Sequence, residues 1–214
     1  MLRVMVLCGL VILFDGMDIF LIGLTAPSIA AFLQVKPAAL GPAFSMSQAG
    51  IMLGALLFGP LADRFGRRRL VIFTTAMFSA CTLATVLIGS FHQLLLCRFL
   101  TGLGLGGATP NVVALAAEHA PSRLRSALVA AVWAALPLGG ALAGVASSLM
   151  QGPLGWRSLF YLGGLAPLAL VAVLYWGLPH SQRSPLKSPQ GEKAHGVPVQ
   201  RLLDRKSTRL NSSH

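Results

Sequence analysis

Six long apolar stretches, separated by short polar or basic segments, fill the first 178 of the 214 residues. An α-helix needs about 20 apolar residues to cross the ~30 Å hydrocarbon core of a bilayer, and each stretch is of about that length or longer. The pattern therefore predicts an all-α integral membrane protein, a bundle of six transmembrane helices. The predicted helices cover residues 4–33, 42–62, 70–89, 94–117, 126–150 and 159–178.

The first stretch and the connections carry further local signals. At 1.5 Å per residue the first stretch exceeds the hydrocarbon core, so its helix must tilt or bend, and Pro27 favours a bend near its far end. Met1 lies almost against this helix, so we expect a preceding cytoplasmic segment to be missing. Phe91-His92-Gln93 predicts a minimal turn between the third and fourth helices.

Basic residues are distributed unequally between the two sets of alternate connections. One set of alternate connections is rich in arginine. The other set contains only two basic residues, Lys36 and Arg157. Short loops rich in Lys and Arg stay cytoplasmic. With six spans, both termini are therefore predicted on the cytoplasmic side. The arginine-rich set, together with the C-terminal segment, contains Arg64, Arg67, Arg68, Arg69, Arg123, Arg125, Arg183, Lys187 and Lys193.

Composition supports the membrane class and argues against a nucleic-acid partner. The chain is 55% hydrophobic and 11% charged, with a mean hydropathy of +0.72, whereas soluble domains carry about 25% charged residues. The net charge of +11 lies in short loops and the C-terminal segment, where the positive-inside bias and anionic membrane lipid explain it. Cys8, Cys81 and Cys97 fall inside apolar runs and indicate neither a disulfide nor a metal framework.

Glycines spaced one helical turn apart predict close approach between helices. The run from Gly102 to Gly107 also satisfies the dinucleotide pattern G-x-G-x-x-G. That pattern needs a preceding strand and an acidic residue about 20 positions on, and neither is found here. We therefore predict packing contacts and no nucleotide or other cofactor. The pairs are Gly50 with Gly54, Gly102 with Gly106, and Gly140 with Gly144.

Charged side chains within a membrane span are costly and by default mark a functional site. Asp15 and Asp18 share a helix face, with Cβ atoms about 5–6 Å apart. Two like charges in a poorly solvated site cannot both ionise cheaply, so one is expected to hold a proton, as proton coupling requires. The alternative is that one aspartate only pairs with a cation. The polar candidates are Asp15, Asp18, Arg98, Asn111 and, at the edge, Glu118.

The one arginine inside a span is suited to binding carboxylates. The guanidinium of Arg98 presents fixed donors that match a carboxylate, whether of a side chain or of a substrate. We predict that Arg98 pairs with Asp18 across the first and fourth spans, because neither charge is tolerable alone. Protonation of Asp18 would then release Arg98 to bind a substrate carboxylate. Asn111 is predicted to link neighbouring helices rather than to bind a ligand.

Two loops carry a resemblance to a known family. Gly59-x-x-x-Asp63-Arg64-x-Gly66-Arg67-Arg68 resembles the loop between the second and third helices of major facilitator superfamily transporters. Glu118-x-x-Pro121-x-x-x-Arg125 resembles that family's loop after the fourth helix. The resemblance implies a conformational latch, in which Asp63 contacts a helix of the second half and Glu118 and Arg125 extend the charge network. Gly59 and Gly66 are expected to permit close approach and a tight reversal.

The first span resembles one branch of that superfamily. Asp15-Gly16-Met17-Asp18 is similar to the D-G-x-D signature of the aromatic acid:proton symporters. Those bacterial inner-membrane proteins import 4-hydroxybenzoate, protocatechuate and related acids. The resemblance therefore implies that Asp15, Asp18 and Arg98 bind protons and a small aromatic acid.

The chain departs from a complete transporter of this kind. Such transporters have two six-helix halves with the substrate between them, and residues 1–178 match one half of a major facilitator fold, its N-terminal one. Residues 179–203 have the polar composition of a cytoplasmic linker. Residues 204–214 resemble a translated sequencing adapter, so we expect an artefactual tail and a missing C-terminal half.

Three functions are weighed from the sequence. The first is a fragment of a proton-coupled importer of small aromatic carboxylates that works by alternating access. The second is a major facilitator porter of another substrate, a sugar or an aliphatic acid. The third is a six-helix scaffold that transports nothing, and buried charge argues against it. No nucleophile–base pair or metal-ligand cluster indicates an enzyme.

Overall fold

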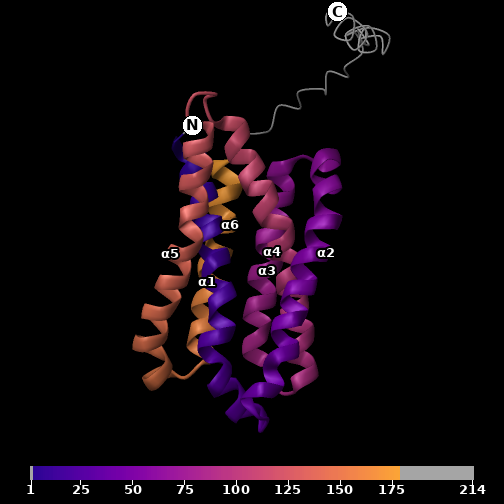
Figure 1. Ribbon diagram of the computed structural model, residues 1–214, viewed down its shortest axis with the longest axis vertical. Helices are drawn as coiled ribbons and strands as arrows, with labels where there is room; N and C mark the ends of the chain where they lie inside the picture. The colour runs from indigo at the N-terminus through magenta and orange to yellow at the C-terminus, as the bar shows by residue number, and fades with distance from the viewer. Residues whose placement is uncertain (1, 179–214) are drawn as a thin grey trace, which may run out of the picture. The chain divides into compact units, whose positions relative to one another are not determined.

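A computed structural model describes residues 2–178, and six helices in that range are long and apolar enough to cross a membrane (Figure 1). No strand occurs among the described residues. All six predicted spans are present. The predicted linker over 179–203 and tail over 204–214 lie outside the described residues. The elements are α1 (Leu2–Leu33), η1 (Pro37–Leu40), α2 (Gly41–Phe65), α3 (Arg67–Ala84), η2 (Thr85–Leu87), α4 (Phe91–His119), α5 (Arg125–Leu154) and α6 (Arg157–Gly177).

The turn before α4 differs from the prediction. Phe91, His92 and Gln93 form no turn but open the helix. The side chain of Ser90 accepts a hydrogen bond from the backbone N–H of Gln93 at 3.3 Å, and the Gln93 side chain accepts from the N–H of Gly89 at 2.7 Å. This reciprocal pair resembles a capping box, which satisfies donors that a helix start leaves free. The polar residues that suggested a loop are therefore a cap.

The reversal between α2 and α3 depends on one glycine. α2 continues past Ala62 to Phe65, and Gly66 ends it with φ +91°. The N–H of Gly66 donates to the carbonyl of Ala62 at 2.9 Å, and α3 begins at the next residue. A residue with a Cβ rarely adopts this conformation. The tight reversal expected at Gly66 is present.

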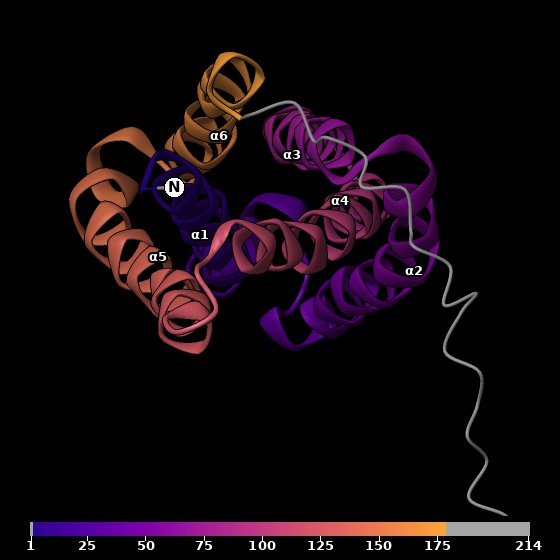
Figure 2. The same cartoon turned by 90° about the horizontal axis from the view of Figure 1, so that it is seen from above.

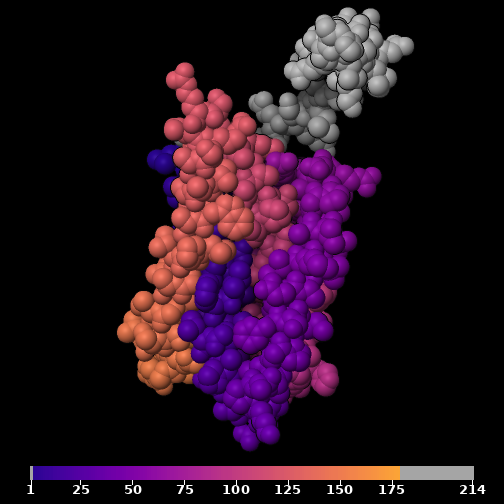
Figure 3. All heavy atoms as spheres, viewed as in Figure 1, coloured from indigo at the N-terminus to yellow at the C-terminus, as the bar shows by residue number. Residues whose placement is uncertain are grey.

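The bundle has two central helices and two groups around them (Figure 2). α1 packs against α5 and α6, α4 packs against α2 and α3, and α3 also contacts α6. In the most apolar windows, 61% of residues are buried in α1 and in α4, but only 17% in α2 and 22% in α5. On the face in Figure 3, α1 lies between α5 and α2. α2 and α5 therefore expose most of their apolar surface.

Glycines set the two closest helix contacts. Between α2 and α4, a Cβ added at any of four glycines would lie 2.0–2.2 Å from a carbonyl oxygen of the other helix. Between α1 and α5, Gly16 and Gly139 have the same role, against Leu136 and Leu13. In lipid such van der Waals contact replaces the hydrophobic drive to associate. The four glycines of the first contact are Gly50, Gly54, Gly102 and Gly106.

The predicted packing pair in α5 is wrong by one residue. A Cβ at Gly144 would meet nothing within 4 Å, and one at Gly140 would meet only the Phe20 ring. Gly139 instead faces the backbone of α1. Gly140 has a glycine four residues on and Gly139 has Ala143 there, so the spacing rule selects Gly140. The two glycines point about 100° apart around the helix. Only the helix orientation decides between them.

Two apolar clusters fill the described bundle and leave a polar layer between them. One cluster contains the α1 residues from Val4 to Ile12, and the other begins on α1 at Met17 and continues to Ala30. Asp15 and Asp18 lie where the clusters meet, and both are 2% exposed. Cys8, Cys81 and Cys97 are free thiols.

Candidate functional site

A buried ion pair joins the two central helices. Arg98 Nη1 of α4 lies 3.4 Å from Asp18 Oδ2 of α1, and both side chains are almost fully buried, at 1% and 3% exposed. Asp18 lies near the middle of α1. The predicted contact between the first and fourth spans is therefore present. Because water does not reach the pair, each charge depends on the other for compensation.

Hydroxyl groups of the bundle form further hydrogen bonds with this pair. Thr82 donates to Asp18 Oδ1 at 2.7 Å. Arg98 Nη2 donates to Thr85 at 2.9 Å and to Thr101 at 3.4 Å. The guanidinium carbon also lies 5.3 Å from the centroid of the Phe160 ring, within cation–π range. Four helical segments thus hold Arg98 in one orientation.

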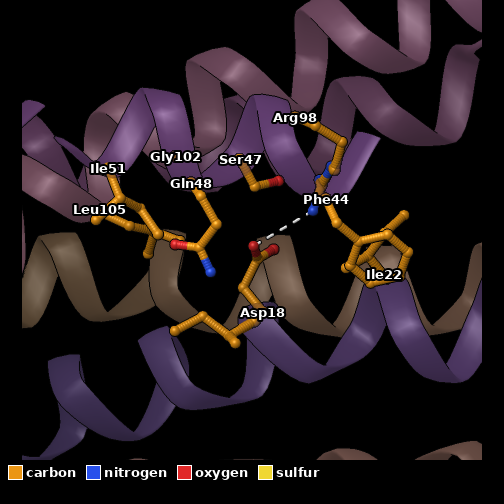
Figure 4. Close-up of a pocket in the computed structure, with 10 residues that line it drawn as sticks. Asp18, Ile22, Phe44, Ser47, Gln48, Ile51, Arg98, Gly102 and Leu105 are labelled. Atoms are coloured by element: carbon orange, nitrogen blue, oxygen red, sulfur yellow. Dashed lines mark hydrogen bonds and ion pairs between the residues drawn. The ribbon is translucent and has the colours of Figure 1, made fainter. Parts of the chain in front are cut away.

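The arginine keeps an unused donor beside a cavity. Its Nε is buried and has no hydrogen-bond partner among the described residues. A cavity of about 80 Å³ opens next to the pair (Figure 4). Binding pockets for small molecules measure about 300–1,000 Å³, so this cavity is only part of a site for an organic solute. Its walls are Asp18, Ile19, Ile22, Phe44, Ser47, Gln48, Ile51, Arg98, Gly102 and Leu105.

Asp15 has a different environment from Asp18. It accepts a hydrogen bond from the hydroxyl of Thr109 on α4, and it forms no ion pair with another of residues 2–178. Both carboxylates therefore contact α4, from positions one turn apart on α1. Gly16 between them packs on the backbone of α5 at Leu136. Within this one turn of α1, the side chains contact α4 and the glycine contacts α5.

Asn111 does not link helices as predicted. Its Nδ2 donates to the carbonyl of Gly107 at 2.7 Å, four residues back in α4. The side chain is 5% exposed, so this bond satisfies a donor that would otherwise be buried alone. In apolar surroundings, the nearest acceptor of a short polar side chain is the preceding turn of its own helix.

Arg67 forms the centre of a charge network at one end of the bundle. Its Nη1 lies 2.6 Å from Glu118 Oε1 at the end of α4, and its Nη2 lies 3.9 Å from Asp63 Oδ1. The side chain of Asp63 is 69% exposed and that of Glu118 is 48% exposed. The network therefore joins the α2–α3 reversal to α4, and it leaves Asp63 largely accessible. Exposed pairs of this kind contribute little stability, about 0–1 kcal/mol.

Two other residues of the predicted latch, Arg68 and Arg125, lie outside this network. Arg68 points to α6, where it donates to the Tyr175 carbonyl and stacks on the Tyr175 ring at 5.9 Å. Arg125 is exposed at the start of α5 and makes no ion pair with another described residue. A Cβ at Gly59 would meet nothing within 4 Å, so the expected close approach there does not occur within residues 2–178. Arg64 and Pro121 are both exposed.

Sequence reasoning missed the hydroxyl residues. Thr82 and Thr85 lie three residues apart and share a face, which is the helical spacing of a polar stripe. Thr109 lies in α4, eleven residues after Arg98, again on one face of the helix. Threonine is common in membrane spans, so only their contact with charged groups identifies them as part of the site. No group of three metal-ligating side chains occurs among the described residues.

The described residues thus form a six-helix bundle with a buried charge pair between its central helices. The sequence profile of the Major Facilitator Superfamily matches residues 8–210. The chain belongs to this superfamily.

Three of the curated relatives are named for the transport of aromatic acids. The 4-hydroxybenzoate transporter PcaK of Pseudomonas aeruginosa is 41% identical over 181 residues, which cover 85% of this chain and 40% of the relative. The gallate transporter of Pseudomonas putida is 39% identical over 180 residues, covering 84% and 40%. The 3-(3-hydroxy-phenyl)propionate transporter of Escherichia coli is 37% identical over 197 residues, covering 92% and 47%. The chain therefore spans less than half the length of each of these relatives.

Solved structures agree on the fold. The proton:xylose symporter XylE superposes with a TM-score of 0.77 at 21% identity, over 84% of this chain and 45% of that structure. The bacterial homologue of the lysosomal transporter Spinster gives 0.68 at 20% identity, over 85% and 45%. At these identities the likeness is one of fold alone.

Proposed function

We propose that this chain is the N-terminal half of a proton-coupled importer of small aromatic carboxylates. The observation that carries the proposal is the buried Asp18–Arg98 pair, which borders a cavity in the middle of the bundle. Scaffolding needs no such charges, and buried charges in a membrane usually mark the route of a solute or proton.

The pair supplies a mechanism for coupling. A proton taken up by Asp18 removes its negative charge and leaves Arg98 without a counter-ion. A solute carboxylate can then replace Asp18, since the guanidinium still has a free buried Nε and binds carboxylates through two parallel hydrogen bonds. Release of the solute restores the pair once Asp18 loses its proton. Proton and carboxylate therefore bind together or not at all.

The second carboxylate and the cavity walls favour an aromatic acid. Asp15 lies one turn away and accepts from Thr109, so it offers a second position for a proton. Phe44 and Ile22 give the cavity an apolar wall, and Gln48 adds an amide that can reach a phenolic hydroxyl. The relatives named for hydroxybenzoate, gallate and hydroxyphenylpropionate transport support this substrate class.

The missing wall of the site belongs to a second half. α2 and α5 expose large apolar side chains. In the view of Figure 3, α1 lies between these two helices. We assign the surface between α2 and α5 to a C-terminal six-helix half, since the relatives are more than twice as long as the part that this chain matches. The solute would lie between the halves near the midplane and cross by alternating access. The exposed residues include Met52, Leu53, Leu56, Leu57, Leu138, Leu142, Val145 and Leu149.

The charge network fits a conformational latch at the cytoplasmic face. The end of the bundle with Arg64, Arg67, Arg68, Arg69, Arg123 and Arg125 is assigned to the cytoplasm by the positive-inside rule. Both termini then lie in the cytoplasm, in the inner membrane of a bacterium. Asp63 is the exposed member of the network and is available to a helix of the second half. The function that we propose is therefore transport and not an enzymatic reaction.

Uptake by a full-length protein that contains this half tests the proposal. Proteoliposomes with an imposed pH gradient, acid outside, should accumulate labelled 4-hydroxybenzoate, and a protonophore should abolish the accumulation. Xylose and succinate serve as comparison solutes. Uptake of either one in place of 4-hydroxybenzoate would assign the protein to another substrate class. Uptake of none of the three by correctly inserted protein would favour a scaffold.

A further inference from the structure

A second cavity, of about 360 Å³, lies at the arginine-rich end of the bundle, where α3 and α6 run side by side (Figure 2). We infer that this cavity binds the headgroup phosphate of an anionic phospholipid. The inference does not depend on the transport proposal, because none of these residues borders the Asp18–Arg98 site. The cavity is lined by Arg68, Arg69, Ile72, Tyr175, Trp176 and Leu178.

Arg68 and Arg69 bring positive charge, and neither forms an ion pair with an acidic residue in the range 2–178. Arg68 Nε is buried and makes no hydrogen bond, although the same guanidinium is fixed by its bond to the Tyr175 carbonyl and by stacking on the Tyr175 ring. Arg69 is exposed and makes no ion pair with a described residue. Among the described acidic residues, Asp63 and Glu118 are engaged by Arg67. A held guanidinium with a spare donor is ready to receive a phosphate oxygen.

Helix capping accounts for only part of this arrangement. Arg68 and Arg3 donate to the carbonyls of Tyr175 and Trp176, in the last turn of α6. Such bonds satisfy carbonyls that a helix end leaves free, and cations are favourable there. Capping explains why Arg68 reaches α6. It does not explain Arg69, the buried free Nε or the hollow between the two helices.

The other walls select a lipid over a free anion. Tyr175 is 61% exposed and Trp176 is 80% exposed, and rings of this kind occupy the headgroup level of a bilayer. Ile72 and Leu178 extend the cavity with apolar surface. A free phosphate would use the arginines and leave these walls bare. A phospholipid places its phosphate on the arginines and its glycerol and first methylenes on the apolar side, as in other basic pockets between membrane helices.

Lipid binding to the purified 214-residue chain tests the inference. Native mass spectrometry should detect phosphatidylglycerol retained by the chain in preference to phosphatidylcholine. Arg69→Gln should weaken phosphatidylglycerol binding about fivefold, the usual effect of one basic residue near an anionic surface. Arg123→Gln is the matched control, an exposed arginine at the same end of the bundle without an ion pair among the described residues. It should bind as the parent chain does.

Further measurements separate an anionic phospholipid site from a free-phosphate site and from unselective lipid binding. Trp176→Ala should weaken phosphatidylglycerol binding and leave any binding of inorganic phosphate unchanged. Millimolar inorganic phosphate that displaced phosphatidylglycerol fully would indicate a free-phosphate site and overturn the inference. So would equal retention of phosphatidylcholine, or a loss in Arg123→Gln as large as in Arg69→Gln. Arg68→Gln also removes the bond that caps α6, so this variant can be replaced by Arg69→Gln: if Arg68→Gln fails to fold, phosphatidylglycerol binding by Arg69→Gln is the deciding measurement.

Discussion

Removal of one partner of the Asp18–Arg98 pair should destabilise the bundle more than removal of both. Each side chain is at most 3% exposed, so a lone charge left behind has no water to compensate it. Loss of one partner of a buried pair costs about 3–5 kcal/mol, whereas replacing both partners by neutral groups is often close to neutral. We therefore expect a large cost for Asp18→Asn and a smaller one for the double variant with Arg98→Gln.

The two single variants should also differ from each other. In Asp18→Asn the guanidinium stays charged, because arginine does not lose its proton in proteins. Its bonds to Thr85 and Thr101 and the Phe160 ring remain, but no anion does. In Arg98→Gln the aspartate can take up a proton and keep its bond to Thr82. Asp18→Asn should therefore be the more damaging change.

Thermal unfolding in detergent measures the stability of the parent chain, the two single variants and the double variant, which together form a double-mutant cycle. For a chain of this size, 1 kcal/mol corresponds to a Tm shift of about 2–4 °C, so Asp18→Asn should lower the Tm by about 6–20 °C. The double variant should recover at least half of that loss. Ser148→Ala, a change in an exposed residue of α5, is a control and should leave the Tm unchanged. Single-variant losses that simply add in the double variant would refute the reasoning, since they would show that the two residues do not interact.

Three further predictions concern other parts of the molecule. The 214-residue chain alone should insert into membranes but drive no uptake of 4-hydroxybenzoate in proteoliposomes, and any such uptake would contradict a site between two halves. In a full-length protein, Asp63→Asn should slow transport at least about fivefold with normal insertion; normal transport would leave the loop only a topological role. Gly102→Ala should cost about 1–3 kcal/mol in detergent unfolding, because its Cβ would overlap the Ser47 carbonyl, whereas Gly144→Ala should cost nothing.

The helices and the charge pair are the parts that sequence reasoning predicts well. Apolar runs must form helices in lipid, since no other local structure satisfies the backbone there. Arg98 and Asp18 are identified because a buried charge requires a partner and the spans offer few. The ends of helices are predicted less well. In the sequence, the residues of the Ser90–Gln93 cap look like a polar turn.

Contacts between distant helices are what the sequence leaves open. Glycine spacing selects Gly140, but the rotation of α5 brings Gly139 against α1. Thr82 and Thr109 become site residues only because α3 and α4 place them against Asp18 and Asp15. Arg68 stands in the loop motif, yet its side chain turns to α6. Each of these outcomes depends on helix orientation, which hydropathy and spacing do not encode.

The absent side chain at Gly16 determines how α1 can move. The carbonyl of Leu136 lies 2.1 Å from the place where a Cβ would be, so the backbones of α1 and α5 are in direct contact. Rotation of α1 about its own axis would drive a neighbouring side chain into that carbonyl. Packed interfaces change between discrete arrangements and do not deform continuously, so α1 and α5 should shift as one piece. A helix with no ionisable side chain from Ser126 to Leu154 would thereby respond to protonation of Asp18.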